Sequence, residues 1–172
     1  MLVVLLVMSA VVAMVTAVVA GGLLLPARHV ITREREVNAS PDRVWARVAA
    51  PTTYATWQRH VRRIESLTES PMRWREFTVD GAFTWQCTDA QAPHRFVARV
   101  IDDDVQRQTE RAVALEPTGN GTRIRCTEAA VHANPIPRFV YRYLLRPEPQ
   151  LDALLDDLVR TIDAAASADS AR

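Results

Sequence analysis

"NASPDRVWARVAAPTTYATW", residues 38–57, is a short helical stretch between two strand-like segments, and it decides the fold. Ser40 can cap a helix that begins at Pro41, because proline suits the first helical position. Apolar residues at i, i+1 and i+4 spacing would share the inner face of this helix: Val44, Trp45 and Val48. A helix this short, with strands on both sides, is typical of a lid over a pocket.

A second helical turn follows the first. Pro51 ends the first helix and restarts the chain. The new turn carries a Tyr-x-x-Trp pair, Tyr54 and Trp57, after which strand-like sequence resumes.

The first 25 residues, "MLVVLLVMSAVVAMVTAVVAGGLLL", carry no charged side chain. A helix of this length reaches about 37 Å, enough to cross a hydrocarbon core of about 30 Å with some tilt. We therefore predict a transmembrane anchor over residues 1–26. The alternative is a secretory signal peptide cleaved after Val18-Val19-Ala20, but this segment lacks a basic start and its apolar run exceeds the usual ~7–15 residues.

Basic residues follow the apolar segment and none precedes it. By the positive-inside rule, Arg28, Arg33 and Arg35 place the domain on the cytoplasmic side of the cell membrane, behind a single-pass anchor. Arg33 and Arg35 could instead belong to a folded strand, which would weaken this assignment.

Composition narrows the function classes. The formal net charge is +1, from 21 basic and 20 acidic residues, so no strong field points to nucleic acid as a partner. Cys87 and Cys126 lie in separate strand-like runs, without a Cys-x-x-Cys motif or metal-ligand spacing to a histidine. We expect two reduced thiols and neither a metal nor a cofactor.

Strand-like runs rich in β-branched and aromatic residues fill most of the chain after Val30. They are separated by short turn sequences: Asp80-Gly81, Ala92-Pro93, Asp102-Asp103-Asp104 and Thr118-Gly119-Asn120-Gly121. Such connections predict hairpins and hence an antiparallel sheet. One folded domain is expected over residues 27–166, with a disordered tail at 167–172.

One face of this sheet should be covered. Alternation places Ile124, Cys126 and Glu128 on one face and Arg123 and Arg125 on the other. The cover is an amphipathic helix in "PQLDALLDDLVRTIDAAA", whose apolar residues recur at helical spacing: Leu151, Leu154, Leu155, Leu158 and Ile162.

The order of these elements resembles the START-like superfamily, also called SRPBCC, and within it the polyketide cyclase/dehydrase-type and lipid-transfer families. The resemblance is carried by "VNASPDRVWARVAAPTTYATWQRHVRRIESL", by "LEPTGNGTRIR" and by the C-terminal amphipathic helix, over residues 30–165. It implies an α+β helix-grip fold: a curved antiparallel sheet of about seven strands around a long C-terminal helix, with two short helices after the first strand. An apolar cavity would lie between sheet and helix.

The resemblance also assigns expected places to aromatic residues. Trp45, Tyr54 and Trp57 would plug the end of the sheet or rim the cavity mouth, and Trp45 fits core packing better. The complete set of candidate ligand-binding residues is Tyr54, Trp57, Trp74, Phe83, Trp85, Ile124, Glu128 and Leu155.

Three functions remain open on these grounds, and one of them is a structural or partner-binding module with a filled core and no cavity. The first is binding, with or without transfer, of a hydrophobic small molecule such as a lipid, quinone or polyketide-like compound. The alternative is a cyclase/dehydrase-like enzyme that uses the same cavity, although the sequence lacks a recognisable catalytic motif. Glu128 is the weak catalytic candidate, as a cavity acid, and an ion pair with a nearby arginine is the simpler reading.

The segment "NPIPRFVYRYLLRPEP" precedes the long helix. It places Ile136, Phe139 and Tyr143 along one side and Arg138 and Arg142 along another. Such an aromatic and basic pattern could lie on the membrane surface or pack over the cavity mouth. Both together would suit a lipid entering from the bilayer.

Overall fold

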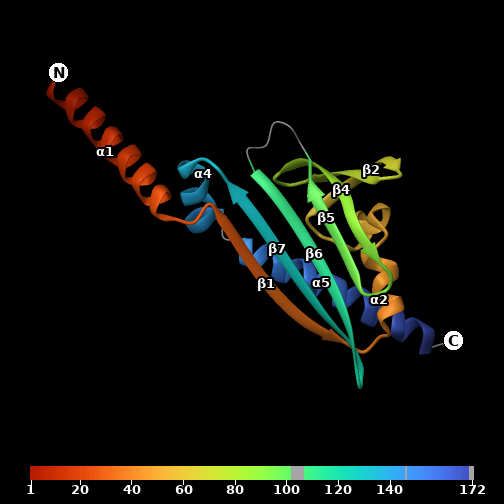
Figure 1. Ribbon diagram of the computed structural model, residues 1–172. Coiled ribbons are helices and arrows are strands. Elements are labelled where there is room, and N and C mark those ends of the chain that lie inside the picture. Colours follow the sequence, from red (N-terminus) through yellow and green to blue (C-terminus); the bar gives the residue numbers. More distant parts are fainter. Residues whose placement is uncertain (102–106, 146, 171–172) are drawn as a thin grey trace.

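A seven-stranded antiparallel sheet curves around a long C-terminal helix in the computed structural model, which describes residues 1–101, 107–145 and 147–170 (Figure 1). The strand order is β1-β7-β6-β5-β4-β3-β2, with every neighbouring pair antiparallel. The strands are β1 (Arg28–Val37), β2 (Val61–Glu69), β3 (Met72–Thr78), β4 (Gly81–Gln91), β5 (Arg95–Val100), β6 (Arg107–Thr118) and β7 (Gly121–His132). The predicted helix-grip fold is confirmed.

Short helices connect β1 to β2, as expected: α2 (Pro41–Val48), the 3-10 turn η1 (Pro51–Thr53) and α3 (Tyr54–Trp57). Pro41 is the first residue of α2. Ser40 precedes it and accepts hydrogen bonds from the Arg43 and Val44 N–H groups through its carbonyl, while its hydroxyl makes no capping hydrogen bond. These are the first hydrogen bonds of the helix itself, so the predicted side-chain cap by Ser40 is wrong.

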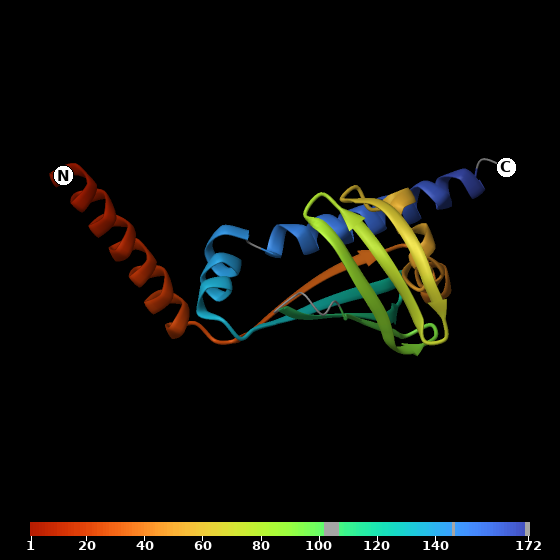
Figure 2. The same ribbon diagram turned by 90° about the horizontal axis from the view of Figure 1, so that it is seen from above.

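The C-terminal helix α5 (Pro147–Ser170) crosses the concave face of the sheet (Figure 2). Its predicted apolar stripe is buried: Leu151, Leu154, Leu155, Leu158 and Ile162. The helix extends to Ser170, into the segment expected to be a tail, because the alanine-rich sequence after Asp163 continues to favour helix. Ser167 supports this last part by donating a hydrogen bond to the Asp163 carbonyl.

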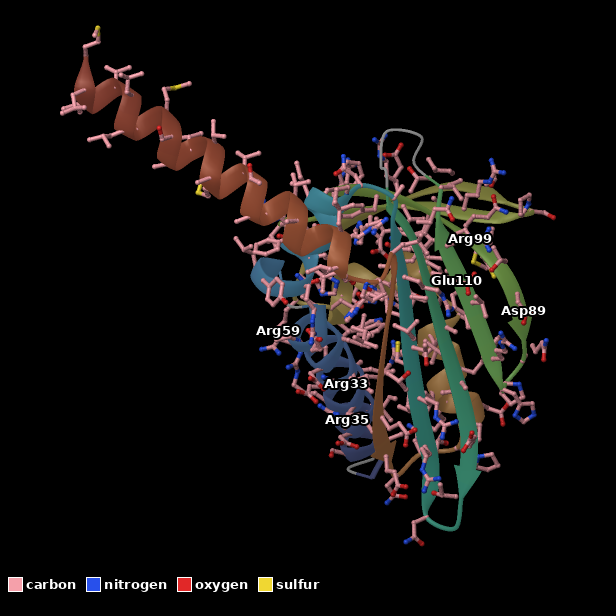
Figure 3. All side chains as sticks on the ribbon, turned by 60° about the vertical axis from the view of Figure 1, so that its left-hand side comes forward. Arg33, Arg35, Arg59, Asp89, Arg99 and Glu110 are labelled. Atoms are coloured by element: carbon pink, nitrogen blue, oxygen red, sulfur yellow. The ribbon has the colours of Figure 1, made fainter. Side chains whose placement is uncertain are left out.

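Ion pairs hold α5 against the edge strand β1. Arg33 Nε lies 3.1 Å from Asp152 Oδ2, and Arg35 bonds Asp152 and Asp156 at 3.0 and 2.9 Å (Figure 3). These two arginines therefore belong to a folded strand, and they carry less weight in the membrane-orientation argument than their place in the sequence indicates.

The turn between β6 and β7 is fixed by Gly121. Its φ of +152° is a conformation that side-chain-bearing residues rarely adopt, and an added Cβ would lie 2.1 Å from the Val37 carbonyl oxygen. Thr122 beside it donates a hydrogen bond of 2.7 Å to the Ala39 carbonyl. The connection predicted at Asp102-Asp103-Asp104 lies outside the described residues.

The N-terminal helix α1 (Leu2–Leu24) projects away from the domain and is long and apolar enough to cross a membrane (Figures 1 and 2). Its C-terminal part meets the domain at α4 (Pro135–Val140). The π-helical turn η2 (Tyr141–Leu145) follows α4. Gly22 is buried there, and a Cβ on it would lie 2.0 Å from the Pro135 carbonyl oxygen. This close backbone approach sets the position of α1 on the domain.

Candidate functional site

A cavity of about 320 Å³ is enclosed by β3, β4, β6, β7, η2 and the start of α5; we call it the grip cavity. Its aromatic lining is Phe83, Trp85 and Tyr141. Its polar lining is His60, Glu76, Thr78, Asp80, Thr109, Arg111, Glu128 and Gln150. The cavity is therefore mixed in character, with more ionisable groups than a purely apolar pocket would contain.

A smaller cavity of about 30 Å³ adjoins the grip cavity, since Glu76, Trp85 and Arg111 line both. The remaining lining residues are Tyr54, Trp74, Phe96, Ala98 and Val113. Trp74 and Trp85 stack there with ring centroids 6.4 Å apart. The aromatic residues of this smaller cavity are all buried.

An ion pair occupies the wall of the grip cavity. Arg111 and Glu128 are cross-strand partners, and Arg111 donates from Nε and Nη2 to Glu128 Oε2 at 3.2 and 2.9 Å. Tyr141 donates to the other carboxylate oxygen at 3.4 Å. Burial alone lowers the pKa of Arg111, but the charge of Glu128 beside it leaves that pKa above its ordinary value. Arg111 therefore stays cationic, and Glu128 is fully engaged in the pair.

Glu76 is the second acid of the cavity and is 3 % exposed. Trp74 Nε1 donates to Glu76 Oε1 at 3.0 Å. Burial raises the pKa of Glu76, against the opposing effects of the Arg111 charge and of the Trp74 and Trp85 indoles. Its carboxyl group is thus shifted toward the neutral acid, which can donate as well as accept a hydrogen bond.

His60 lies at the edge of the same cavity. Burial and the nearby charge of Arg111 lower its pKa, so the imidazole is shifted toward its neutral form. Burial therefore favours the neutral form of two ionisable groups of the cavity, Glu76 and His60.

Five of the eight predicted site residues line the two cavities. Phe83 and Glu128 line the grip cavity, Tyr54 and Trp74 line the smaller cavity, and Trp85 lines both. Trp57, Ile124 and Leu155 are buried in the hydrophobic core and line neither. Trp45 packs on the edge of this core, with its ring 6.2 Å from that of Phe96.

Sequence reasoning missed Glu76 and Arg111. Glu76 is two residues after Trp74 and therefore on the same strand face, and Arg111 is two residues before the buried Val113. The two-residue alternation of the strands placed both side chains on the buried face, but a charged residue in a strand is ordinarily expected to face solvent.

A further cavity, of about 350 Å³, lies where α1 meets the domain; we call it the junction cavity. Its lining is Leu25, Pro26, Ala27, His29, His132, Arg138, Tyr141 and Arg142. Tyr141 lines both this cavity and the grip cavity, and its ring lies 4.7 Å from that of His132 and 5.6 Å from that of His29. Tyr141 is therefore a wall residue shared by the two cavities.

Comparison with known proteins identifies the class. The model of the family described as polyketide cyclase/dehydrase and lipid transport matches residues 28–163, so the chain belongs to this family. A sequence search of curated proteins found no match. The family description covers both cyclase chemistry and ligand transport, and its match accords with a domain that binds a small molecule or cyclises one.

Solved structures share the fold at low sequence identity. A START superfamily protein from Mycobacterium smegmatis aligns with a TM-score of 0.67 and 16% identity, over 80% of this chain and 99% of that one. Norcoclaurine synthase from Thalictrum flavum, a point mutant bound to a transition-state analogue, gives 0.65 and 17%, over 81% and 96%. The di-domain ARO/CYC StfQ of the steffimycin biosynthetic pathway gives 0.66 and 12%, over 82% of this chain and 53% of that one.

Proposed function

We propose that this protein is a membrane-tethered domain that binds a hydrophobic small molecule, such as a lipid, a quinone or a polyketide-like compound, in the grip cavity. The observation that carries the proposal is the grip cavity itself, with its aromatic and polar lining under α5. A ligand that loses about 200 Å² of apolar surface there would gain on the order of 5 kcal/mol before ordering costs.

The surroundings of α1 support tethering. Leu144, Tyr143 and Ile136 of η2 and α4 expose large apolar side chains next to the end of α1. Arg138 of α4 donates to the carbonyls of Leu25, His132 and Ala133, which ties the chain after α1 to the domain. Apolar side chains beside arginines at the end of a membrane helix suit the headgroup region, and the arginines favour a cytoplasmic domain.

The same arrangement offers a route for the ligand. A molecule leaving the bilayer would enter the junction cavity beside α1 and pass Tyr141 to reach the grip cavity. With an entrance next to the membrane anchor, an apolar ligand could move from the bilayer into the protein without crossing water.

Native mass spectrometry of the full chain, released from membranes of its own host, tests the proposal. A co-purifying hydrophobic mass is expected on the wild-type protein and should be lost from Thr78→Trp, which fills the grip cavity from its edge. The matched control is Thr68→Trp, an exposed position on β2. A wild-type protein that stays free of ligand after incubation with membrane extract would contradict the proposal.

A second candidate is an enzyme of the cyclase/dehydrase type. It is favoured by Glu76, a buried acid whose pKa is raised by burial, close to Arg111 and the Tyr141 hydroxyl in one cavity. Glu76→Gln and Glu128→Gln separate the two functions: a binding protein keeps most of its affinity, whereas an enzyme keeps ligand but loses turnover.

A further inference from the structure

The wall of the grip cavity contains two buried polar groups without a hydrogen-bond partner among the described residues: Trp85 Nε1 and Thr109 Oγ1. Trp85 is 5 % exposed and Thr109 3 %. The Trp85 indole N–H lies near enough to the Glu76 carboxyl to lower the pKa of Glu76, but the two groups fall outside hydrogen-bond geometry. Buried donors are nearly always paired in proteins, so two unpaired ones on a cavity wall indicate a group that the cavity receives.

The two groups belong to one region of the sheet. Trp85 of β4 pairs with Val100 of β5. Arg99 of β5 pairs with Glu110 of β6, so the antiparallel register places the next residue of β5, Val100, opposite Thr109. Trp85 and Thr109 therefore flank Val100 from either side, on the same row of the sheet. Arg111 extends from β6 over the Trp85 ring, with its guanidinium carbon 4.9 Å from the ring centroid.

The chemistry of the two donors defines what they would bind. An indole N–H only donates, so its partner must be an acceptor, and a threonine hydroxyl can donate to the same kind of atom. The ionisable lining argues against an anionic acceptor: it contains three carboxyl groups, those of Glu76, Asp80 and Glu128, and one arginine. The side-chain hydrogen bonds of Arg111 to described residues both go to Glu128. A carboxylate would add like charge to this site.

We infer that the ligand of the grip cavity presents a neutral oxygen acceptor, a ketone or ester carbonyl, to Trp85 Nε1–H and the Thr109 hydroxyl. The inference rests on the proposed function and narrows it to apolar molecules with a carbonyl. Trp85 and Thr109 are then specificity residues: they distinguish a carbonyl compound from a hydrocarbon of the same shape.

Three naphthalene probes of similar shape test this on the full chain in detergent micelles, with empty micelles as the reference: 2-acetylnaphthalene, 2-isopropylnaphthalene and 2-naphthoate. Equilibrium dialysis should show the ketone binding about 3- to 10-fold more tightly than the hydrocarbon, the effect of one or two hydrogen bonds. Trp85→Phe and Thr109→Val should each reduce this preference and leave hydrocarbon binding nearly unchanged. A carbonyl-¹³C label on the ketone adds a direct readout, since its chemical shift reports the hydrogen bond.

Trp57→Phe is the matched control. Its indole N–H is also buried without a described partner, but Trp57 does not line the grip cavity, so the ketone preference should survive. Equal binding of ketone and hydrocarbon by the wild-type protein, or naphthoate binding as tightly as the ketone, would overturn the inference while leaving the proposed function standing. Absence of binding by all three probes would count against both.

Discussion

Arg111 of β6 stands directly opposite Glu128 of β7, with Arg111 Nη2 2.9 Å from Glu128 Oε2 and the two side chains only 22% and 14% exposed. Removing one charge leaves the other poorly solvated inside the cavity wall. We expect Glu128→Gln to lower the free energy of unfolding by about 2 kcal/mol, somewhat less than the ~3–5 kcal/mol of a fully buried pair.

Urea denaturation measures this effect, and the pair between Arg99 and Glu110 supplies the control (Figure 3). It also joins neighbouring strands, but its side chains are 54% and 41% exposed. Glu110→Gln should therefore change stability by less than about 1 kcal/mol. Equal losses for the two variants would show that the Arg111–Glu128 pair is no more than a surface contact.

Asp157 should make the stability of the folded protein depend on pH in acid. It is 1 % exposed on α5 and accepts hydrogen bonds from the Arg59 backbone N–H, Arg59 Nε and Arg160 Nη2 at 2.9, 2.8 and 2.8 Å. Burial alone raises the pKa of Asp157, but these donors more than offset it and hold the pKa below its ordinary value. The ionised Asp157 therefore stabilises the fold fully above the pKa of aspartate in the unfolded chain, about 3.9. This stabilisation is lost as the pH falls through the lower pKa of Asp157 in the folded protein.

Asp157→Asn should accordingly cost about 2 kcal/mol at pH 7, as expected for hydrogen bonds to a charged group. It should also flatten the loss of stability between about pH 5 and pH 2 relative to the wild-type protein. Thermal denaturation over this range measures both effects. Asp163→Asn, at an exposed position of the same helix, should change neither, and an Asp157→Asn protein that keeps the full acid dependence would contradict the assignment.

Tyr141 lines both the junction cavity and the grip cavity, and we expect it to control exchange between them. Tyr141→Ala is expected to accelerate loading at least about fivefold, equivalent to a barrier lower by about 1 kcal/mol. Tyr141→Phe keeps the ring and removes the hydroxyl that donates to Glu128 at 3.4 Å, so it should exchange at nearly the wild-type rate. Stopped-flow energy transfer from tryptophan to N-phenyl-1-naphthylamine supplied in vesicles measures the rate; equal rates for the two variants would refute this role of Tyr141.

Gly121 should be irreplaceable in the turn before β7. Alanine there would combine a φ of +152° with a Cβ 2.1 Å from the Val37 carbonyl oxygen, at a cost of about 3 kcal/mol or more. Gly119 in the same turn is the control, because a Cβ there meets no atom within 4 Å. Gly119→Ala should stay within about 0.5 kcal/mol of the wild-type protein in urea denaturation.

Gly22 should fix α1 to the domain. A Cβ at Gly22 would lie 2.0 Å from the Pro135 carbonyl oxygen, whereas one at Gly21 would meet only the Phe139 side chain, at 3.1 Å. Gly22→Ala should therefore separate α1 from α4 and accelerate trypsin cleavage after Arg138, mapped by mass spectrometry on protein in nanodiscs. Gly21→Ala should be cleaved at nearly the wild-type rate, and the same acceleration in both variants would show that the close approach at Gly22 is not the cause.

The fold was accessible from the sequence because its main determinants are local. Pro41 and Pro51 delimit the short helices, alternation sorts Ile124 and Cys126 from Arg123 and Arg125, and helical spacing marks the buried leucines of α5. Each of these signals depends on residues a few positions apart. The resemblance to the START-like superfamily then supplied the order in which the elements pack.

The site depended on contacts between distant segments. Arg111 and Glu128 meet because β6 and β7 pair in one register. Glu76 is buried because its side of β3 faces the interior. Tyr141 lines both cavities because η2 folds back from the end of β7. The sequence by itself determined the elements, the apolar anchor segment and which faces are buried. Tertiary structure alone decided which ionisable groups share a cavity, because burial and pairing depend on the register and curvature of the whole sheet.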